Sequence, residues 1–190
     1  MNKPVEKALQ RAVDGTQLKL TEYARKLRYD DLPEDIVHAA KVRVIDTLGS
    51  LIGGFFAEPC RIARDVAAAM PNAAGATVIG TRMKTTPEMA AYVNAATARY
   101  VEMNDIYHWP GSSVAHPSDV VTPILAAAEH VHAGGMDFIA SIVLAYALTL
   151  ASAHAFSNDG FDNTTFGCLG SAVGAGKVLG LTSEQLAHCI

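Results

Sequence analysis

The chain has 190 residues, of which 50% are hydrophobic and 18% are charged, and its formal net charge is -4. This composition is typical of a globular protein and not of a disordered chain, and an alanine-rich sequence with few aromatic residues favours helices over sheets. The negative charge and the lack of a Lys/Arg cluster argue against nucleic acid as a partner and favour a small molecule. We therefore predict an all-α fold, a multi-helix bundle formed by residues 1–190 as one domain.

The first half of the chain shows helical periodicity interrupted by glycine and proline. Asp31-Leu32-Pro33-Glu34 has the form of a helix start, with Asp31 as a candidate cap. Apolar residues then recur every three or four positions up to Gly53-Gly54, and the same period returns over residues 61–70. Residues 76–80 are rich in β-branched residues, which predicts an isolated extended segment outside any sheet.

Longer helices are predicted in the middle of the chain. A Thr-Pro-Glu start predicts a helix over residues 86–103, and a second helix is expected over residues 119–135. Asp137 is expected to cap the next helix, residues 138–156, which contains no Asp, Glu, Lys or Arg. That stretch is long enough to cross a bilayer, but its polar residues and the lack of a flanking basic or aromatic belt favour a buried central helix. No membrane association is predicted.

The C-terminal part predicts two more helices after a turn at Asn158-Asp159-Gly160. Residues 164–179 form a helix whose glycines should let neighbouring backbones approach closely, namely Gly167, Gly170, Gly174 and Gly176. Thr182-Ser183-Glu184-Gln185 has the capping-box pattern of a last helix. That helix stays apolar to the last residue, so we expect the domain to be truncated at its C-terminus and completed by further sequence or a separate chain.

Residues 102–119 carry the highest concentration of polar side chains between two alanine-rich helices. Polar groups are costly to hold beside buried helices, so this segment indicates a functional site. His116-Pro117-Ser118-Asp119 provides an imidazole, the side chain best suited to proton transfer at neutral pH. The alternative for this tetrapeptide is a helix-entry turn, in which Ser118 or Asp119 is the cap and His116 is simply exposed.

Asn104-Asp105 follows the preceding predicted helix. The amide can hold a carboxylate or hydroxyl of a substrate, and the carboxylate can orient a histidine or act as a base. The alternative is an Asx turn that ends the helix. Together with His116, the pair could converge on one ligand as a general base and its orienting partner.

Other patterns give weaker signals. His130 and His132 point to different sides of a helix, so we predict no metal site. The glycine-rich run that ends at Lys177 lacks the first glycine and the Ser/Thr of a phosphate-binding loop, and we expect Lys177 to face solvent or to snorkel.

The cysteine pattern and the N-terminus bear on the compartment. Three widely spaced cysteines indicate a reducing environment, and they are Cys60, Cys168 and Cys189. The first residues include charges and a proline where a secretory signal needs an apolar run. A cytoplasmic location is therefore expected.

Three motifs, read in this order and spacing, resemble the MmgE/PrpD family: Arg99-Tyr-Val-Glu-Met-Asn-Asp105, His116-Pro-Ser-Asp119 and Gly160-Phe-Asp-Asn163. This family includes 2-methylcitrate dehydratase and cis-aconitate decarboxylase. The resemblance covers nearly the whole chain and implies an N-terminal helical domain, normally followed by a smaller lid domain that is absent here. It also implies a cofactor-independent, usually homodimeric enzyme that acts on tricarboxylates, with carboxylate-binding lysines and a further histidine in later sequence.

The resemblance implies a hydro-lyase of the 2-methylcitrate dehydratase type, with His116 as acid or base and Asp105 as its partner or as an alternative base. Asn104 would anchor a carboxylate or hydroxyl of the substrate. The secondary binding groups would be Arg99, Ser118 and Asn163. A structural salt bridge is the alternative role for Arg99.

Two positions depart from the family pattern. Ile106 stands where dehydratase-like members usually have threonine, and Asn163 stands where the family often has histidine. These departures keep two alternatives open, a decarboxylase or isomerase of a related polycarboxylate, and a non-catalytic, lid-less helical protein that binds a ligand or partner.

Overall fold

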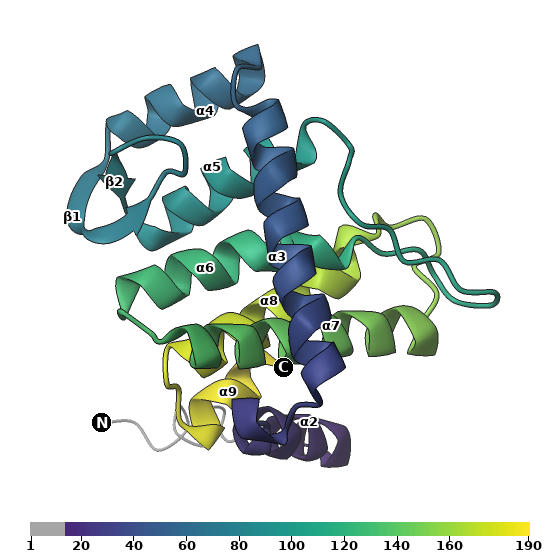
Figure 1. The fold of residues 1–190 in the computed structure, drawn as a ribbon. Coiled ribbons are helices and arrows are strands. Elements are labelled where there is room, and N and C mark those ends of the chain that lie inside the picture. The colour runs from purple at the N-terminus through teal and green to yellow at the C-terminus, as the bar shows by residue number, and fades with distance from the viewer. Residues whose placement is uncertain (1–13) are drawn as a thin grey trace, which may run out of the picture.

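Helices dominate the computed structural model, which describes residues 14–190 (Figure 1). In chain order they are α2 (Gly15–Lys26), α3 (Glu34–Gly54), α4 (Glu58–Ala68), α5 (Pro87–Arg99), α6 (Val121–His130), α7 (Gly135–Ala155), α8 (Thr164–Val178) and α9 (Ser183–Cys189). Two 3-10 turns, η1 (Tyr29–Asp31) and η2 (Pro117–Val120), precede α3 and α6. The all-α prediction is confirmed, whereas the N-terminal sequence used to argue against a secretory signal lies outside the described residues.

α7 is the central helix and packs against α8 and α3 (Figure 1). Its side chains Ile142, Leu144 and Ala145 are completely buried. By length and composition α7 could cross a membrane, but 50% of its apolar window is buried inside the bundle. Such burial is expected of a core helix.

Glycine brings α8 close to α7. A Cβ atom at Gly170 would lie 2.2 Å from Thr149 Oγ1, and one at Gly174 would lie 3.0 Å from Ala145 Cβ, both on α7. The predicted close approach is confirmed at these positions and at Gly176, where a Cβ would lie 3.0 Å from Leu186 Cδ2. The prediction is wrong at Gly167, where no neighbouring atom lies within 4 Å of such a Cβ.

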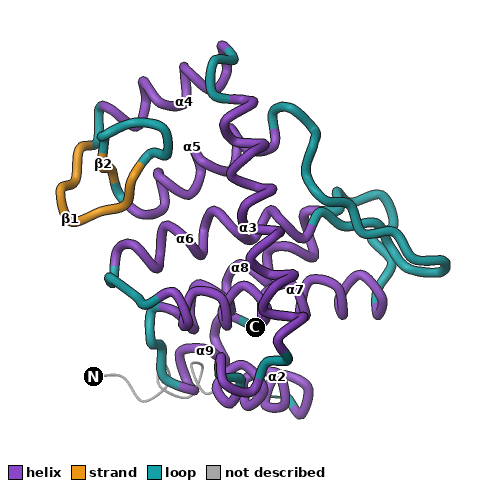
Figure 2. Tube along the Cα trace, viewed as in Figure 1, coloured by secondary structure: helices purple, strands orange, loops and turns teal. Residues whose placement is uncertain are grey.

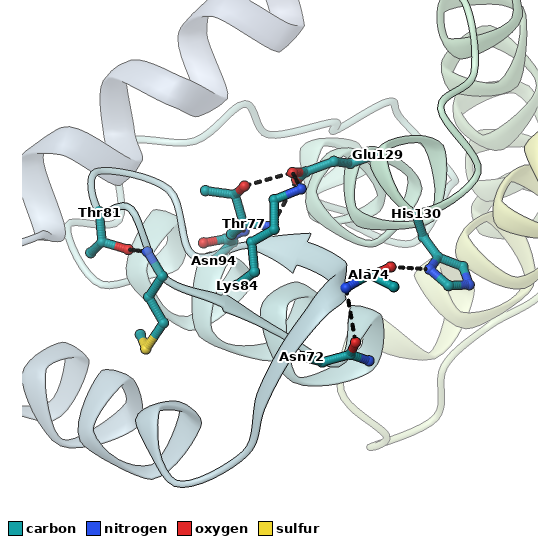
Figure 3. A network of polar contacts seen from close by, with 9 residues as sticks. Asn72, Ala74, Thr77, Thr81, Lys84, Asn94, Glu129 and His130 are labelled. Carbon is teal, nitrogen blue, oxygen red and sulfur yellow. Dashed lines mark hydrogen bonds and ion pairs between the residues drawn. The ribbon is translucent and has the colours of Figure 1, made fainter.

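The segment predicted to be isolated is paired instead. β1 (Pro71–Thr77) and β2 (Lys84–Thr85) form an antiparallel hairpin in which Thr77 lies opposite Lys84. Glu129, near the end of α6, accepts hydrogen bonds from Thr77 N at 2.7 Å and Thr77 Oγ1 at 2.6 Å (Figure 3). Glu129 also lies 3.1 Å from Lys84 Nζ, so both strands are fixed by one carboxylate. Local sequence does not reveal such a long-range partner.

Two more side chains attach the hairpin to the bundle (Figure 3). Asn94 of α5 accepts from Ile79 N and donates to Thr77 O, both at 3.0 Å. His130 Nδ1 lies 2.9 Å from Ala74 O, and the carbonyl can only accept, so His130 donates. His130 is exposed and serves this contact.

Several predicted helix boundaries need correction. α5 ends at Arg99 instead of near Met103, because the chain turns at Glu102, whose φ of 51° is left-handed. Gly134 precedes the first residue of α7, and Asp137 lies in its first turn instead of at its cap. Pro33 occupies the cap position of α3, while Asp31 accepts a hydrogen bond from Arg28 N in the preceding turn.

α2 was missed by the sequence analysis. The side chain of Asp14 caps it by accepting from Thr16 N and Gln17 N at 2.8 Å. Lys177, expected at the surface, is half-buried and donates to Ala24 O of α2 at 2.8 Å. Burial lowers the pKa of Lys177.

Two long loops, residues 100–116 and 156–163, lie together at one end of the bundle (Figure 2). Ser113 joins them, since its N donates to Ala153 O at 2.9 Å and its Oγ to Phe156 O at 3.1 Å. Tyr107 OH contacts His154 Nε2 at the end of α7. The first loop is thus docked on the end of α7, and it holds the predicted site residues Asn104, Asp105 and His116.

Candidate active site

His116 stands at the start of η2, and its side chain is only 11% exposed. Its Nδ1 lies 2.8 Å from the main-chain oxygen of Asp105. Because a carbonyl oxygen can only accept, this contact assigns the proton of the neutral imidazole to Nδ1. Nε2 then carries the lone pair and is the atom available to take a proton.

Asp105 contacts His116 through its main chain, and its carboxylate is engaged elsewhere. Oδ1 accepts a hydrogen bond from Ser118 N at 2.9 Å, and Oδ2 accepts one from Tyr146 OH at 3.1 Å. Burial first, and then the neighbouring Asp105 charge, raise the pKa of Tyr146, so this phenol stays a donor. Because both carboxylate oxygens accept hydrogen bonds, the geometry favours a structural role for Asp105 over a role as a base. Asp105 connects the loop of residues 100–116 with η2 and α7.

Arg99 links the end of α5 to the same turn. Its Nη2 lies 3.1 Å from Glu102 Oε1, and its Nε lies 3.4 Å from Asp119 Oδ1. Glu102 Oε1 in turn lies 3.8 Å from His116 Nε2. Nε2 of His116 therefore faces the carboxylate of Glu102, which lies beside the guanidinium of Arg99. Arg99 forms salt bridges, as the alternative structural role predicted.

Buried polar atoms without a hydrogen-bond partner gather around this cluster. Within residues 14–190 they include Arg99 Nη1, Asn104 Oδ1 and Ser118 Oγ. Native proteins seldom leave such atoms unpaired. A donor, an acceptor and a hydroxyl in one neighbourhood are the groups with which a polar ligand would be bound.

Asn163 is not drawn into this cluster. It occupies the N-cap position of α8 without a capping hydrogen bond from its side chain, and no hydrogen bond connects that side chain with His116 in the part of the chain described here. Its neighbour Asp162 is electrostatically linked to the site. Hydrogen bonds from Thr164, and to a lesser extent the charges of Arg99 and His116, lower the pKa of Asp162.

A cavity of about 300 Å³ lies beside the site, between the end of α7 and the start of α8. Phe156, Phe161 and Phe166 help to line it, and none of the predicted site residues does. His116 and Asp105 meet by a direct hydrogen bond and not across this cavity. Ile106, the departure next to Asp105, is 65% exposed.

Comparison with known proteins identifies the family of the chain. Residues 18–190 match the family model described as the MmgE/PrpD N-terminal domain. The chain belongs to the MmgE/PrpD family.

Individual MmgE/PrpD relatives are distant. The chain is 24% identical to the cis-aconitate decarboxylase of Aspergillus terreus over 92% of the chain and 38% of that protein. It is 24% identical to a cis-aconitate decarboxylase-like protein of Aspergillus oryzae over 88% of the chain and 37% of that protein. It is 29% identical to the 2-methylcitrate dehydratase of Cupriavidus necator over 64% of the chain and 27% of that protein. The chain spans less than two fifths of the length of these curated relatives.

Three residues of this MmgE/PrpD domain received no role from the sequence, namely Glu102, Tyr146 and Asp162. Tyr146 had a usable signal, because it is one of few polar residues in the uncharged helix. Glu102 and Asp162 lie inside motifs that carried the family resemblance. Glu102 is three residues from Arg99, whereas nothing local shows that the Arg99 charge also acts on Asp162. Their association depends on how the two loops fold together.

Proposed function

We propose that this chain supplies the acid–base side of a lyase site that acts on a tricarboxylate, as a hydro-lyase of the 2-methylcitrate dehydratase type. The observation that carries the proposal is the hydrogen bond from His116 Nδ1 to the Asp105 carbonyl, which leaves Nε2 free. A neutral imidazole fixed in this tautomer is suited to take a proton from carbon. Membership of the MmgE/PrpD family supports the reaction class.

In the proposed elimination, His116 Nε2 takes the proton from the carbon beside a substrate carboxylate. The electrons of that C–H bond form the double bond, the C–O bond on the neighbouring carbon breaks with its electron pair on oxygen, and the departing hydroxyl takes a proton from solvent and leaves as water. Arg99 Nη1 would meet a substrate carboxylate, and Asn104 Oδ1 would accept from the hydroxyl. Ser118 Oγ and Asn163 are retained as secondary binding groups.

The charge of the site supports a further part of the proposal. The carboxylates of Glu102, Asp105, Asp119 and Asp162 outnumber the one permanent cation, Arg99, and the neutral His116 adds no positive charge. A tricarboxylate would be repelled by this surface alone. We propose that cationic groups of a lid, in further sequence or in a separate chain, complete the site, and that no cofactor takes part.

Decarboxylation of cis-aconitate is the second candidate. The similarity to the cis-aconitate decarboxylase extends over 92% of the chain, compared with 64% for the dehydratase. In that reaction a C–C bond to a carboxylate would break in place of a C–O bond, and His116 would protonate the resulting carbanion.

Product analysis distinguishes the hydro-lyase hypothesis from the decarboxylase hypothesis. The protein is incubated with 2-methylcitrate and, separately, with cis-aconitate, and NMR follows the products. An unsaturated tricarboxylate from 2-methylcitrate supports the hydro-lyase, and carbon dioxide from cis-aconitate supports the decarboxylase. If the protein neither converts nor binds either compound, that result would favour the non-catalytic alternative.

The role of His116 is tested with His116→Gln. We expect kcat to fall by about 10²- to 10⁴-fold, the usual contribution of a general acid or base. His188→Gln is the matched control, since His188 is an exposed histidine of α9. Unchanged turnover in His116→Gln would reject the proton-transfer role.

We also propose that the protein is a homodimer. The outer face of α3 supports this, because Ile45 is 68% exposed and Ile52 is 69% exposed. Phe56, just beyond α3, is 89% exposed. Exposed apolar side chains grouped in this way favour an interface. Sedimentation of the protein and of Ile52→Glu tests it, and a wild-type monomer at all concentrations would reject it.

A further inference from the structure

The geometry points to Tyr146 as a positioning residue, which holds Asp105 and thereby fixes the tautomer and orientation of the His116 imidazole. The inference rests on the proposed acid–base role of His116, and it assigns a function in that site to the core helix α7.

Three consecutive hydrogen bonds carry the inference. Tyr146 OH donates to Asp105 Oδ2 at 3.1 Å, and Ser118 N donates to Asp105 Oδ1 at 2.9 Å. The main-chain oxygen of Asp105 then accepts from His116 Nδ1 at 2.8 Å. The side chain of Asp105 is thus held from α7 and from η2, while its main-chain oxygen holds His116.

Tyr146 is itself held firmly. Its neighbours on α7, Ile142 and Ala145, are completely buried. Its ring lines an apolar groove of about 330 Å³ between α3 and α7, together with Ile36 and Leu150. A phenol fixed between two helices is a rigid donor, whereas residues 100–116 form a loop with little regular structure of their own.

Loss of this donor has a predictable effect on the histidine. Without Tyr146 OH, Asp105 Oδ2 has no other hydrogen-bond donor among the residues described. The carboxylate can then rotate and release Ser118 N, and the Asp105 carbonyl moves with it. His116 would no longer be confined to the Nδ1–H tautomer, and molecules with a proton on Nε2 cannot take the substrate proton at that atom.

The tautomer can be observed without any substrate. In protein with ¹⁵N-labelled histidine, above neutral pH, wild-type His116 should show a protonated Nδ1 and an unprotonated Nε2, assigned by their disappearance in His116→Gln. In Tyr146→Phe both nitrogens should shift toward averaged values. Thr149→Val is the matched control, because it removes a buried hydroxyl of the same helix that has no partner in the described residues. Unchanged His116 signals in folded Tyr146→Phe would overturn the inference.

Asp105→Asn provides a second variant in case Tyr146→Phe does not fold. It removes the acceptor charge and should produce the same change in the His116 signals. A wild-type tautomer in folded Asp105→Asn would contradict the inference.

Kinetics then distinguish positioning from substrate binding. On the tricarboxylate that wild type converts, Tyr146→Phe should lower kcat about 10-fold and change KM less than about twofold, as expected when only catalytic geometry is lost. A raised KM with unchanged kcat would overturn the inference. If wild type completed by its lid converts neither tricarboxylate, the proposed function fails, and the ¹⁵N signals still decide the role of Tyr146.

Discussion

Arg99 Nε lies 3.4 Å from Asp119 Oδ1, so the last turn of α5 is connected to the 3-10 turn that begins beside His116. Two opposing effects act on this carboxyl. Burial raises the pKa of Asp119, and the Arg99 charge lowers it by a smaller amount, so the net shift is upward. Keeping Asp119 charged in the folded protein therefore lowers the free energy of unfolding.

This cost predicts a stabilising substitution. Since the folded pKa of Asp119 is raised, the penalty is present above that pKa and absent below the ordinary value of 3.8, where the carboxyl is protonated in both states. Asp119→Asn should raise the free energy of unfolding near neutral pH by up to about 1 kcal/mol. Urea denaturation at neutral and acid pH measures it, and a less stable variant at neutral pH would contradict the prediction.

The contribution of the β1–β2 hairpin to the free energy of unfolding should have the opposite pH dependence. Burial alone would raise the pKa of Glu129, but hydrogen bonds from Thr77 and contact with Lys84 lower it overall. Its contribution is therefore present above the ordinary value of 4.5 and is lost as the pH falls through the folded pKa. Glu129→Gln should lower the free energy of unfolding near neutral pH by about 1–2 kcal/mol, a range that allows for solvent screening.

The difference between Glu129→Gln and wild type should shrink in acid, as urea denaturation would show. Glu22→Gln is the control, because Glu22 forms an exposed pair with Lys26 at 2.6 Å on α2. We expect a much smaller effect there, since exposed pairs contribute little. Equal effects of the two substitutions would count against the role of Glu129.

Two glycines of α8 should respond oppositely to alanine. Gly170→Ala places a methyl group 2.2 Å from Thr149 Oγ1 and 2.6 Å from Ala145 O, which requires α7 and α8 to separate. It should destabilise the protein by about 1–3 kcal/mol. Gly167→Ala meets nothing within 4 Å and should stabilise it by about 0.5–1 kcal/mol, as alanine favours helix. Thermal unfolding compares them, and a shift of equal sign would refute the packing argument.

The contact between Tyr107 and His154 should determine how firmly the site loop is docked. Tyr107 N donates to Ala115 O at 2.8 Å, and Ala115 N donates to Tyr107 O at 3.1 Å. Tyr107→Phe should speed hydrogen exchange at these amides about 10-fold, while the amides of α7 and α8 keep their protection. Exchange measured by NMR tests this. Uniform acceleration would show that the whole bundle had been weakened, contrary to the prediction.

Most helices could be predicted because their signals are local. Thr182 Oγ1 accepts from Gln185 N and Thr182 N donates to Gln185 Oε1, as the capping-box pattern indicated. The turn before α8 also forms, since Phe161 N donates to Asn158 O at 2.7 Å. The hairpin was not predictable in this way, because Glu129, which fixes Thr77, lies 52 residues away.

The sequence predicted which residues belong to the candidate site, but not which of their atoms make the contacts. The sequence brought Asp105 and His116 together, but only the fold shows that a main-chain oxygen makes the contact. Tyr146 lies 41 residues from Asp105, and its hydroxyl could equally have been an isolated polar group in a core helix. Periodicity locates a side chain on a helix, whereas the direction of its hydrogen bond depends on which loop packs there.

The glycine contact between α7 and α8 restricts how the protein can respond to a ligand. Gly170 and Gly174 leave no spare volume for one helix to slide along the other. Tyr146 stands on the first of these helices, and the second begins directly after Asp162 and Asn163. Movement of the site when a ligand binds is therefore expected in residues 100–116 and 156–163, while the two helices keep their relative position.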